Sequence, residues 1–265
     1  MSKEFLETKT TTTISIITLI VFMLSGLFII GSGITDLPRF ISSFTYYASY
    51  IIGGIIGIYA SKKVGLYTYI GKALLFMGLG MITTFIGALV WDYYDFVLGV
   101  EAPYPSWADA FFAMLVPFTI IGLWLLLKIY NISISKRVIV ESIFISILIP
   151  IFIFLLFGPP TISIGQGALT LLFDLFYAFS DAVMVAMAYI ILRTSSKKMF
   201  GGISYIALGL VITAIADVTF SYRTAVETYY FGDISDLLFI MAGLVMTTGI
   251  YLISRNFITR KEQIR

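Results

Sequence analysis

Long apolar runs constrain this chain of 265 residues more than any other feature. An α-helix needs about 20 apolar residues to cross a hydrocarbon core of about 30 Å. The runs are continuously apolar, whereas the strands of a membrane barrel alternate apolar and polar residues. We therefore predict an all-α polytopic membrane protein with eight transmembrane helices. The predicted spans are about 12–34, 39–60, 68–92, 106–128, 138–158, 167–192, 202–222 and 235–254.

Composition supports the same class, because 59% of the residues are hydrophobic and only 12% are charged. The first run is longer than the apolar core of a signal peptide, so we keep it as a span. We expect residues 1–265 to form a single membrane domain. Its tail, 256–265, is short.

The basic residues predict the orientation, because lysine and arginine are retained on the cytoplasmic side of short loops. Only Arg39 and Arg223 fall on the opposite side from the rest. The residues on the majority side are Lys3, Lys9, Lys62, Lys63, Lys72, Lys128, Lys136, Arg137, Arg193, Lys197, Lys198, Arg255, Arg260, Lys261 and Arg265. We predict a multi-pass plasma-membrane protein with both termini in the cytoplasm. The basic residues are thus explained by topology, and no nucleic-acid partner is expected.

Missing residue types exclude several functions. The sequence has no cysteine, so it forms no disulfide and has no thiol nucleophile. It has no histidine either, and histidine is the usual ligand of haem and the commonest ligand of zinc. The last span, 235–254, contains no lysine that could bind retinal as a Schiff base. We therefore expect no cofactor and no metal.

The two halves of the chain resemble each other. The segment "LGMITTFIGALVWDY" (79–93) aligns without a gap over "LGLVITAIADVTFSY" (208–222). In the next span Asp109 aligns with Asp236, and one span earlier Tyr47 aligns with Tyr177. This pattern predicts two parallel repeats of four helices, about 12–128 and 138–255, related by an axis along the membrane normal.

Asp109 and Asp236 each stand at the start of an apolar run. Asp109 follows Ser106 with the spacing of a capping box, in which a serine and an acid bind each other's backbone amides. Asp233 and Asp236 repeat this spacing with an aspartate as the cap. Negative charge is also favourable at a helix N-terminus. Capping is the first interpretation of this pair, and ligand contact is the alternative.

Three other acids are predicted to lie deep in the membrane. Asp174 and Asp181 are seven residues apart, on one face of the sixth span, and Asp217 lies inside the seventh. A carboxylate at such depth is costly unless it faces water, a partner or a proton, so it indicates a functional site. Arg223 is the only nearby cation. The alternative is a structural hydrogen-bonded network that includes Tyr177, Ser180, Thr213 and Ser221.

The aligned positions of the first half carry no such acids, since Ala88 aligns with Asp217 and Ile51 with Asp181. We therefore predict a site among the last three spans that opens outward. Asp92, Asp95 and Glu101 are expected to form a solvated acidic rim, with Asp92 and Asp109 as secondary candidates for ligand contact. Tyr104 is expected to belong to an aromatic belt at the membrane interface, and ligand stacking is the alternative.

The segments "PYPSWADAFFAMLVPFTIIGL" and "LGLVITAIADVTFSY…GDISDLLFIMAGLVMTTGIY" resemble the multi-helix membrane sensor regions that precede diguanylate cyclase and histidine kinase domains in prokaryotes. The likeness covers spans two to eight. It implies a sensor of small ligands that signals to a catalytic domain. Only eleven residues follow the last predicted span, so we expect no output domain in this chain and a signalling partner in the cytoplasm or the membrane.

The segment "LGLVITAIADVTFSY" is also similar to the lysoplasmalogenase-like family of eight-helix membrane hydrolases. That family is thought to use an intramembrane aspartate from each half. The resemblance implies Asp217 as one of the two. Because Ala88 stands at the matching position, the second carboxylate would come from Asp92, Asp174 or Asp181.

Together these observations predict a ligand-binding or sensor-type membrane module with an acid-lined cavity in its second half. The expected ligand is a small cation or an amphiphile, and membrane lipids are expected partners. A lipid hydrolase and a small transporter are the alternatives. The candidate ligand-binding residues are Asp174, Asp181, Asp217, Asp236, Tyr177 and Arg223; no catalytic residue is assigned.

Overall fold

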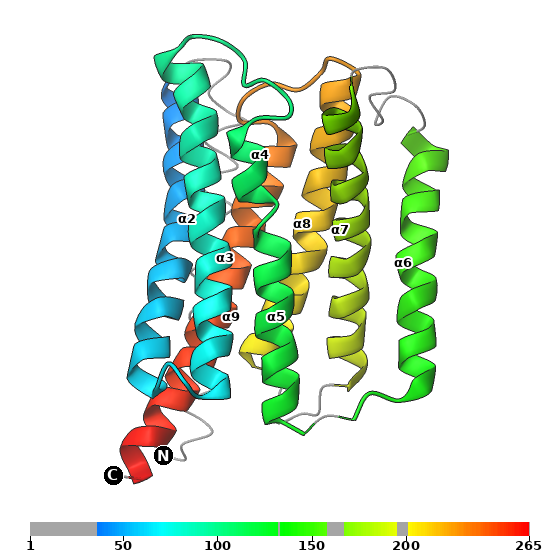
Figure 1. The fold of residues 1–265 in the computed structure, drawn as a ribbon. Coiled ribbons are helices and arrows are strands. Elements are labelled where there is room, and N and C mark those ends of the chain that lie inside the picture. Colours follow the sequence, from blue (N-terminus) through cyan, green and yellow to red (C-terminus); the bar gives the residue numbers. More distant parts are fainter. Residues whose placement is uncertain (1–35, 132, 158–166, 195–200, 265) are drawn as a thin grey trace.

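A computed structural model describes residues 36–131, 133–157, 167–194 and 201–264. In this part of the chain every regular element is a helix, and there is no strand (Figure 1). Its elements are α2 (Asp36–Val64), α3 (Tyr69–Asp92), the π-helix η1 (Tyr93–Val97), α4 (Trp107–Phe112), α5 (Leu115–Ile129), α6 (Lys136–Phe157), α7 (Ala168–Thr194), α8 (Gly202–Ala225) and α9 (Ile234–Ile264). The prediction of an all-α fold is confirmed for these residues.

Six segments are long and apolar enough to cross a membrane, as expected of an integral membrane protein. They are Phe40–Val64, Tyr69–Val97, Trp107–Ile129, Ala168–Thr194, Gly202–Ala225 and Ile234–Thr259. Each overlaps one of the eight predicted spans. The predicted span 12–34 lies outside the described residues. The predicted span 138–158 falls on α6, which is a helix but is not among the six, so the total of eight stays a prediction.

The two ends of the bundle differ in charge. At the lower end in Figure 1, the last turn of α2 carries Lys62 and Lys63, the last turn of α5 carries Lys128, and α6 begins at Lys136. The connections 98–106 and 226–233 lie at the opposite end, which we call the upper end. The basic residues of these helices therefore gather at one end, as the charge pattern predicts.

The apolar core is built from side chains of α2, α3, α5, α7, α8 and α9. α2 packs against both α3 and α9, and α8 packs against α7 and α9. Fully buried side chains such as Met77, Met81, Leu126 and Met246 fill the space between them. In contrast, α6 packs mainly on α7 and stands at the edge of the bundle (Figure 1). Its exposed Phe144 and Phe152 are suited to contact with lipid.

A break divides the segment 107–129 into α4 and α5. Proline has no amide hydrogen, and its ring clashes with the carbonyl group four residues earlier. For Pro117 that carbonyl belongs to Ala113, and the helix is interrupted at Ala113 and Met114. Pro117 therefore produces a short turn between α4 and α5. The aligned residue in α9 is Leu244, and α9 is continuous.

Two helix pairs pack through glycines at aligned positions. A β-carbon on Gly80 of α3 would lie 3.3 Å from the carbonyl oxygen of Leu115 on α5. A β-carbon on Gly209 of α8 would lie 3.4 Å from the carbonyl oxygen of Ala242 on α9. In the predicted alignment Gly80 matches Gly209 and Leu115 matches Ala242. The contact between α3 and α5 therefore has a counterpart between α8 and α9.

A second pair of contacts obeys the same correspondence. A β-carbon on Gly122 of α5 would lie 3.0 Å from the carbonyl oxygen of Ala73 on α3. On Gly249 of α9 it would lie 2.7 Å from the carbonyl oxygen of Gly202 on α8. Backbones approach this closely only where a side chain is absent or very small. Here too the contacting residues are aligned with each other.

Candidate functional site

Asp109 caps α4 in the way its spacing predicts. The carboxylate Oδ2 accepts hydrogen bonds from the backbone amide of Ser106 at 2.7 Å and from its hydroxyl at 3.0 Å. The Ser106 hydroxyl oxygen in turn accepts from the amide of Ala108 at 3.2 Å. These bonds satisfy amides that the helix itself leaves without partners. The predicted capping box is confirmed.

Asp109 also makes a contact outside its own helix. Its second carboxylate oxygen, Oδ1, accepts a hydrogen bond of 3.2 Å from the Tyr177 hydroxyl on α7. Asp109 is 4% exposed, so both oxygens are enclosed by protein. This bond ties the first half of the chain to the second. It places Tyr177, a predicted ligand residue, beside α4.

Asp236 begins α9 in a similar manner, with one change of register. Its Oδ2 accepts from the amide of Gly232 at 2.6 Å, one residue before the amide that a capping box would use. The Tyr229 hydroxyl donates to both carboxylate oxygens at 3.2 and 3.3 Å. Burial and the neighbouring Asp236 raise the pKa of Tyr229 well above its usual value, so this phenol remains a donor. Asp236 thus combines a capping bond with a phenol contact, as Asp109 does.

Asp92 does not lie on a solvated rim, so that prediction is wrong. It is only 8% exposed, and it accepts a hydrogen bond from the Tyr47 hydroxyl on α2. The reason is its place in the last turn of α3, from which the side chain turns toward α2 rather than outward. Asp92 also lies near enough to Asp236 and Tyr229 to interact with them electrostatically.

Asp174 is held by a residue of the upper connection. The Tyr104 hydroxyl donates to Asp174 Oδ1 at 2.7 Å across 70 residues of sequence. Partial burial and this hydrogen bond raise the pKa of Tyr104 well above its usual value, so the phenol stays protonated. Tyr104 was expected in an interfacial aromatic belt. The residue is 41% exposed, and its hydroxyl binds Asp174 at the surface of the bundle.

Asp181 and Asp217 meet in the bundle between α7 and α8, and we call them the carboxyl pair. The two groups face each other at hydrogen-bonding distance. Because an ionised carboxylate only accepts hydrogen bonds, such a bond requires a proton on one of the two. Asp181 is the central residue of the 27 in α7 and is 3% exposed. Its Oδ1 atom is buried and has no hydrogen-bond partner.

Four tyrosines lie near Asp217, and we call them the tyrosine shell. Each lies close enough to Asp217 for electrostatic interaction. They are Tyr46, Tyr50, Tyr104 and Tyr177. Asp217 nevertheless remains half-buried, so part of its surface borders space that protein atoms do not fill. The Tyr50 hydroxyl is occupied, because it donates to the carbonyl oxygen of Phe239 at 3.1 Å.

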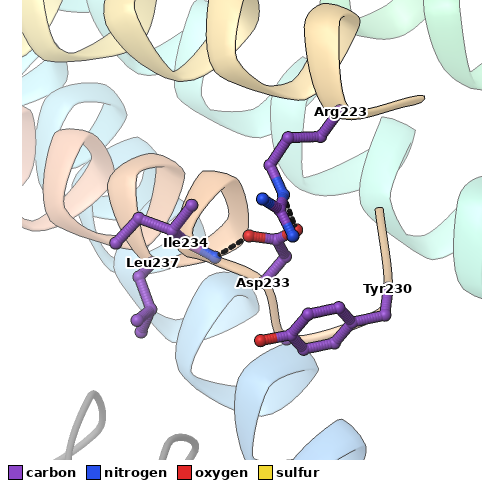
Figure 2. Close-up of a pocket in the computed structure, with 6 residues that line it drawn as sticks. Arg223, Tyr230, Asp233, Ile234 and Leu237 are labelled. Carbon is purple, nitrogen blue, oxygen red and sulfur yellow. Dashed lines mark hydrogen bonds and ion pairs between the residues drawn. The ribbon is translucent and has the colours of Figure 1, made fainter. Parts of the chain in front are cut away.

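Arg223 is not directed toward the deep acids. Its guanidinium forms an ion pair with Asp233, a residue that is 1% exposed, and also donates to the carbonyl oxygen of Thr228 at 2.9 Å. Figure 2 shows this pair, with the Tyr230 ring nearby and the Ile234 amide bound to the same carboxylate. The hollow that these residues line measures about 270 Å³. Asp233 was predicted as a cap, but its ion pair was not.

The structure thus divides the candidate residues into groups. Asp181 and Asp217 meet directly, and Tyr177 lies between Asp217 and Asp109. Asp174 lies seven residues from Asp181 and binds Tyr104 instead. Tyr46, Tyr50 and Tyr104 were missed as neighbours of the site. They come from the first half of the chain, and their only sequence signal was their position near the upper ends of spans.

No side-chain cluster suited to a metal ion occurs in the described part of the chain, where no three acids converge. Comparison with family models, with characterised proteins and with solved structures gives no match to this chain.

Proposed function

We propose that this membrane protein is a ligand-binding module of the sensor type, and that its binding site is the carboxyl pair with the tyrosine shell. The observation that carries the proposal is the buried Oδ1 atom of Asp181, which has no partner next to a second carboxyl group. A polar atom in that state costs free energy unless a ligand, an ion or a water satisfies it. Exposed surface on the adjoining Asp217 gives a ligand a place to bind.

A structural network explains the other acids better than it explains this pair. Asp109 and Asp236 bind backbone amides, Asp92 binds Tyr47 and Asp174 binds Tyr104. Each of these groups has a partner within the protein. The carboxyl pair differs, because the Oδ1 atom of Asp181 is buried without a partner and the hydrogen bonding around the pair is therefore incomplete.

The signalling role rests on the sensor resemblance and on α9. This helix begins beside Asp236 at the upper end and continues to Ile264 beyond the lower end (Figure 1). We infer that the lower end is cytoplasmic, because the basic residues gather there. A signalling partner in the cytoplasm or the membrane would then meet the end of α9.

We also infer that the bundle is built from two repeats, with α2 to α5 matched to α7 to α9. Support comes from the aligned glycine contacts between α3 and α5 and between α8 and α9. The paired threonines agree, since Thr84 donates to the Gly80 carbonyl and Thr213 to the Gly209 carbonyl, both at 3.0 Å. On this basis the site lies where the two repeats meet, and its acids belong to the second.

Carboxyl labelling tests the proposed site. The full chain in lipid nanodiscs is treated with dicyclohexylcarbodiimide, which reacts with protonated carboxyl groups, and the modified residues are mapped by mass spectrometry. We expect Asp217 to react because it is half-buried and shares a proton. A water-soluble carbodiimide should label exposed Glu101 as a positive control. Labelling of Glu101 without any labelling of Asp217 would rule out an accessible site at the carboxyl pair.

A lipid hydrolase is the second candidate, and the carboxyl pair is the observation that favours it. Two carboxyl groups of which one is protonated can supply a general acid and a general base. In a vinyl ether the acid would protonate the alkene carbon, and water activated by the base would add to the oxocarbenium carbon. The resulting hemiacetal breaks into an aldehyde and an alcohol. Aldehyde released from a lysoplasmalogen by the wild type, and lost in Asp217→Asn, would favour this function.

A further inference from the structure

We propose that the ligand of the carboxyl pair is an organic cation, an alkylamine in its ammonium form. This inference rests on the proposed function, because it names the chemical class that the same site would take. It follows from three features of the described residues, namely the sign of the charge at the site, the aromatic rings around it and the small number of carboxylates that converge.

The charge at the site is negative. Asp217 acts electrostatically on every member of the tyrosine shell, Asp109 acts on two of them, and Asp236 acts on Tyr46. Among the side chains that the structure describes at the upper end, the basic one is Arg223, and it already forms an ion pair with Asp233. A carboxylate in a medium of low polarity strongly favours a positively charged neighbour. The site is therefore suited to a cation and would repel an anion.

The aromatic rings favour an organic cation. Tyr46 and Tyr50 lie 4.8 Å apart between ring centroids, and Tyr46 meets Phe239 at 6.4 Å. Phe239 is followed by Phe220 at 6.5 Å. Ring faces attract ammonium groups, and aromatic cages of this kind bind methylated or primary amines. The same rings provide apolar surface for the alkyl chain of the ligand.

Hard metal ions fit this site less well. Calcium takes six to eight oxygen ligands, and magnesium requires a nearly octahedral set. Only two carboxyl groups meet at the pair, and no three acids converge anywhere in the described residues. An ammonium group needs fewer acceptors, and the Oδ1 atom of Asp181 is an unused one. The donor set is thus closer to that of an amine site.

Binding of an ammonium ion would displace the proton that the pair shares. One N–H group would donate to Asp181 Oδ1 and another to Asp217, so both carboxyl groups could ionise and the proton would pass to water. Affinity should therefore fall as the pH decreases. The other titratable groups near the pair or near its tyrosines are Tyr46, Tyr50, Tyr104, Asp109, Tyr177 and Asp236.

The test compares two probes of equal length and different charge. The full chain in phosphatidylcholine nanodiscs is melted with n-hexylamine or with 1-hexanol, in buffers of equal ionic strength adjusted with sodium chloride. We expect hexylamine to raise Tm by about 5 °C at a hundred times its Kd, and hexanol to change it by less than about 1 °C. Calorimetry should show weaker binding of hexylamine at pH 5 than at pH 8.

Variants locate the effect. Asp181→Asn and Asp217→Asn should lose the shift produced by hexylamine, whereas Glu101→Gln in the upper connection should retain it. If a variant fails to fold, the wild type still decides the question, because N,N-dimethylhexylamine, an ammonium ion that forms no stable amide with an activated carboxyl group, should protect Asp217 from carbodiimide while Glu101 continues to react.

Three results would overturn the inference. An equal shift with hexanol would mean that apolar partition is responsible. An equal shift when sodium chloride is added at the same concentration to buffer that has not been adjusted would identify an inorganic cation. Absence of any shift, together with carbodiimide labelling of Asp217, would reject the amine but leave the proposed site standing. Absence of that labelling would reject the proposed site itself.

Discussion

Four aspartates of this bundle have four different hydrogen-bonding environments. Asp109 binds the amide that its helix leaves open, and Asp233 binds a guanidinium. Asp92 binds a phenol, while Asp181 keeps one buried oxygen without a partner. The free energy of each carboxylate is set by these partners rather than by depth alone. Substitutions of single acids should therefore have effects of different sign.

Removing charge from the carboxyl pair should stabilise the fold. In Asp181→Asn or Asp217→Asn the new amide can donate the hydrogen bond that now depends on a shared proton. We expect the free energy of unfolding to rise by about 1 kcal/mol, since functional groups are often held at a cost in stability. Thermal melts in nanodiscs measure this change, with Glu101→Gln as a silent control. Unfolding of both variants would indicate that the pair is a structural network.

Removing charge from the caps should have the opposite effect. Asp109→Asn and Asp236→Asn each leave one acceptor oxygen where two carboxylate oxygens now accept hydrogen bonds. The expected loss is about 0.5–2 kcal/mol of unfolding free energy for each, with little change in the binding of hexylamine. Loss of binding at unchanged Tm would show instead that Asp109 or Asp236 contacts the ligand.

The ion pair at the upper end allows the removal of one charge to be compared with the removal of both. Arg223→Met leaves the buried Asp233 carboxylate without its cation, and we expect a loss on the order of 3 kcal/mol. Adding Asp233→Asn to the same variant should recover most of that loss, because no buried charge then remains. A double variant as unstable as the single one would mean that Arg223 acts through its packing or its bond to Thr228.

At the scale of helices, much of the arrangement follows from local pattern. Apolar length predicts where each described span begins and ends to within a few residues, and Pro117 predicts the interruption between α4 and α5. The face that each helix presents to its neighbours is harder to predict, because hydropathy in a bilayer is similar on all sides. Asp92 was misplaced for this reason: its position in a span says nothing about which helix lies opposite.

The contact between α8 and α9 gives a test of helix packing with a neighbouring control. A β-carbon on Gly202 would lie 2.2 Å from the backbone oxygen of Gly249, whereas on Gly201 its nearest contact is at 3.9 Å. Gly202→Ala should therefore destabilise the protein by about 1–3 kcal/mol, and Gly201→Ala should leave it nearly unchanged. Equal Tm values for the two variants would show that α9 can shift away without cost.

At the scale of the whole molecule, orientation is testable because the chain has no cysteine. We predict that Val100→Cys and Thr228→Cys, in the upper connections, react with an impermeant thiol reagent on intact cells. Ser133→Cys, in the connection between α5 and α6, should react only after lysis. All three positions are exposed. Labelling of Ser133→Cys alone on intact cells would reverse the assigned orientation.

The site itself could be predicted only in part. Depth in a span identified Asp181 and Asp217 one by one, and a spacing of seven placed Asp174 on the face of Asp181. Their partners are distant in sequence, since Tyr104 reaches Asp174 across 70 residues and Tyr50 reaches Phe239 across 189. Such contacts depend on how helices are arranged around one another, which local pattern does not specify. Three members of the tyrosine shell, Tyr46, Tyr50 and Tyr104, were missed for that reason.

The uninterrupted course of α9 has a mechanical consequence. At 1.5 Å per residue its 31 residues form a rod about 46 Å long, which exceeds the thickness of the hydrocarbon core. Because a helix transmits displacement along its axis with little compression, a shift of Asp236 would arrive undiminished at the opposite surface. Spin labels at Ile234 and Thr259 should thus keep a constant separation when hexylamine is added. The distance from the Ile234 label to a reference label on α3 and the distance from the Thr259 label to the same reference should change together, because α9 moves as a rigid rod.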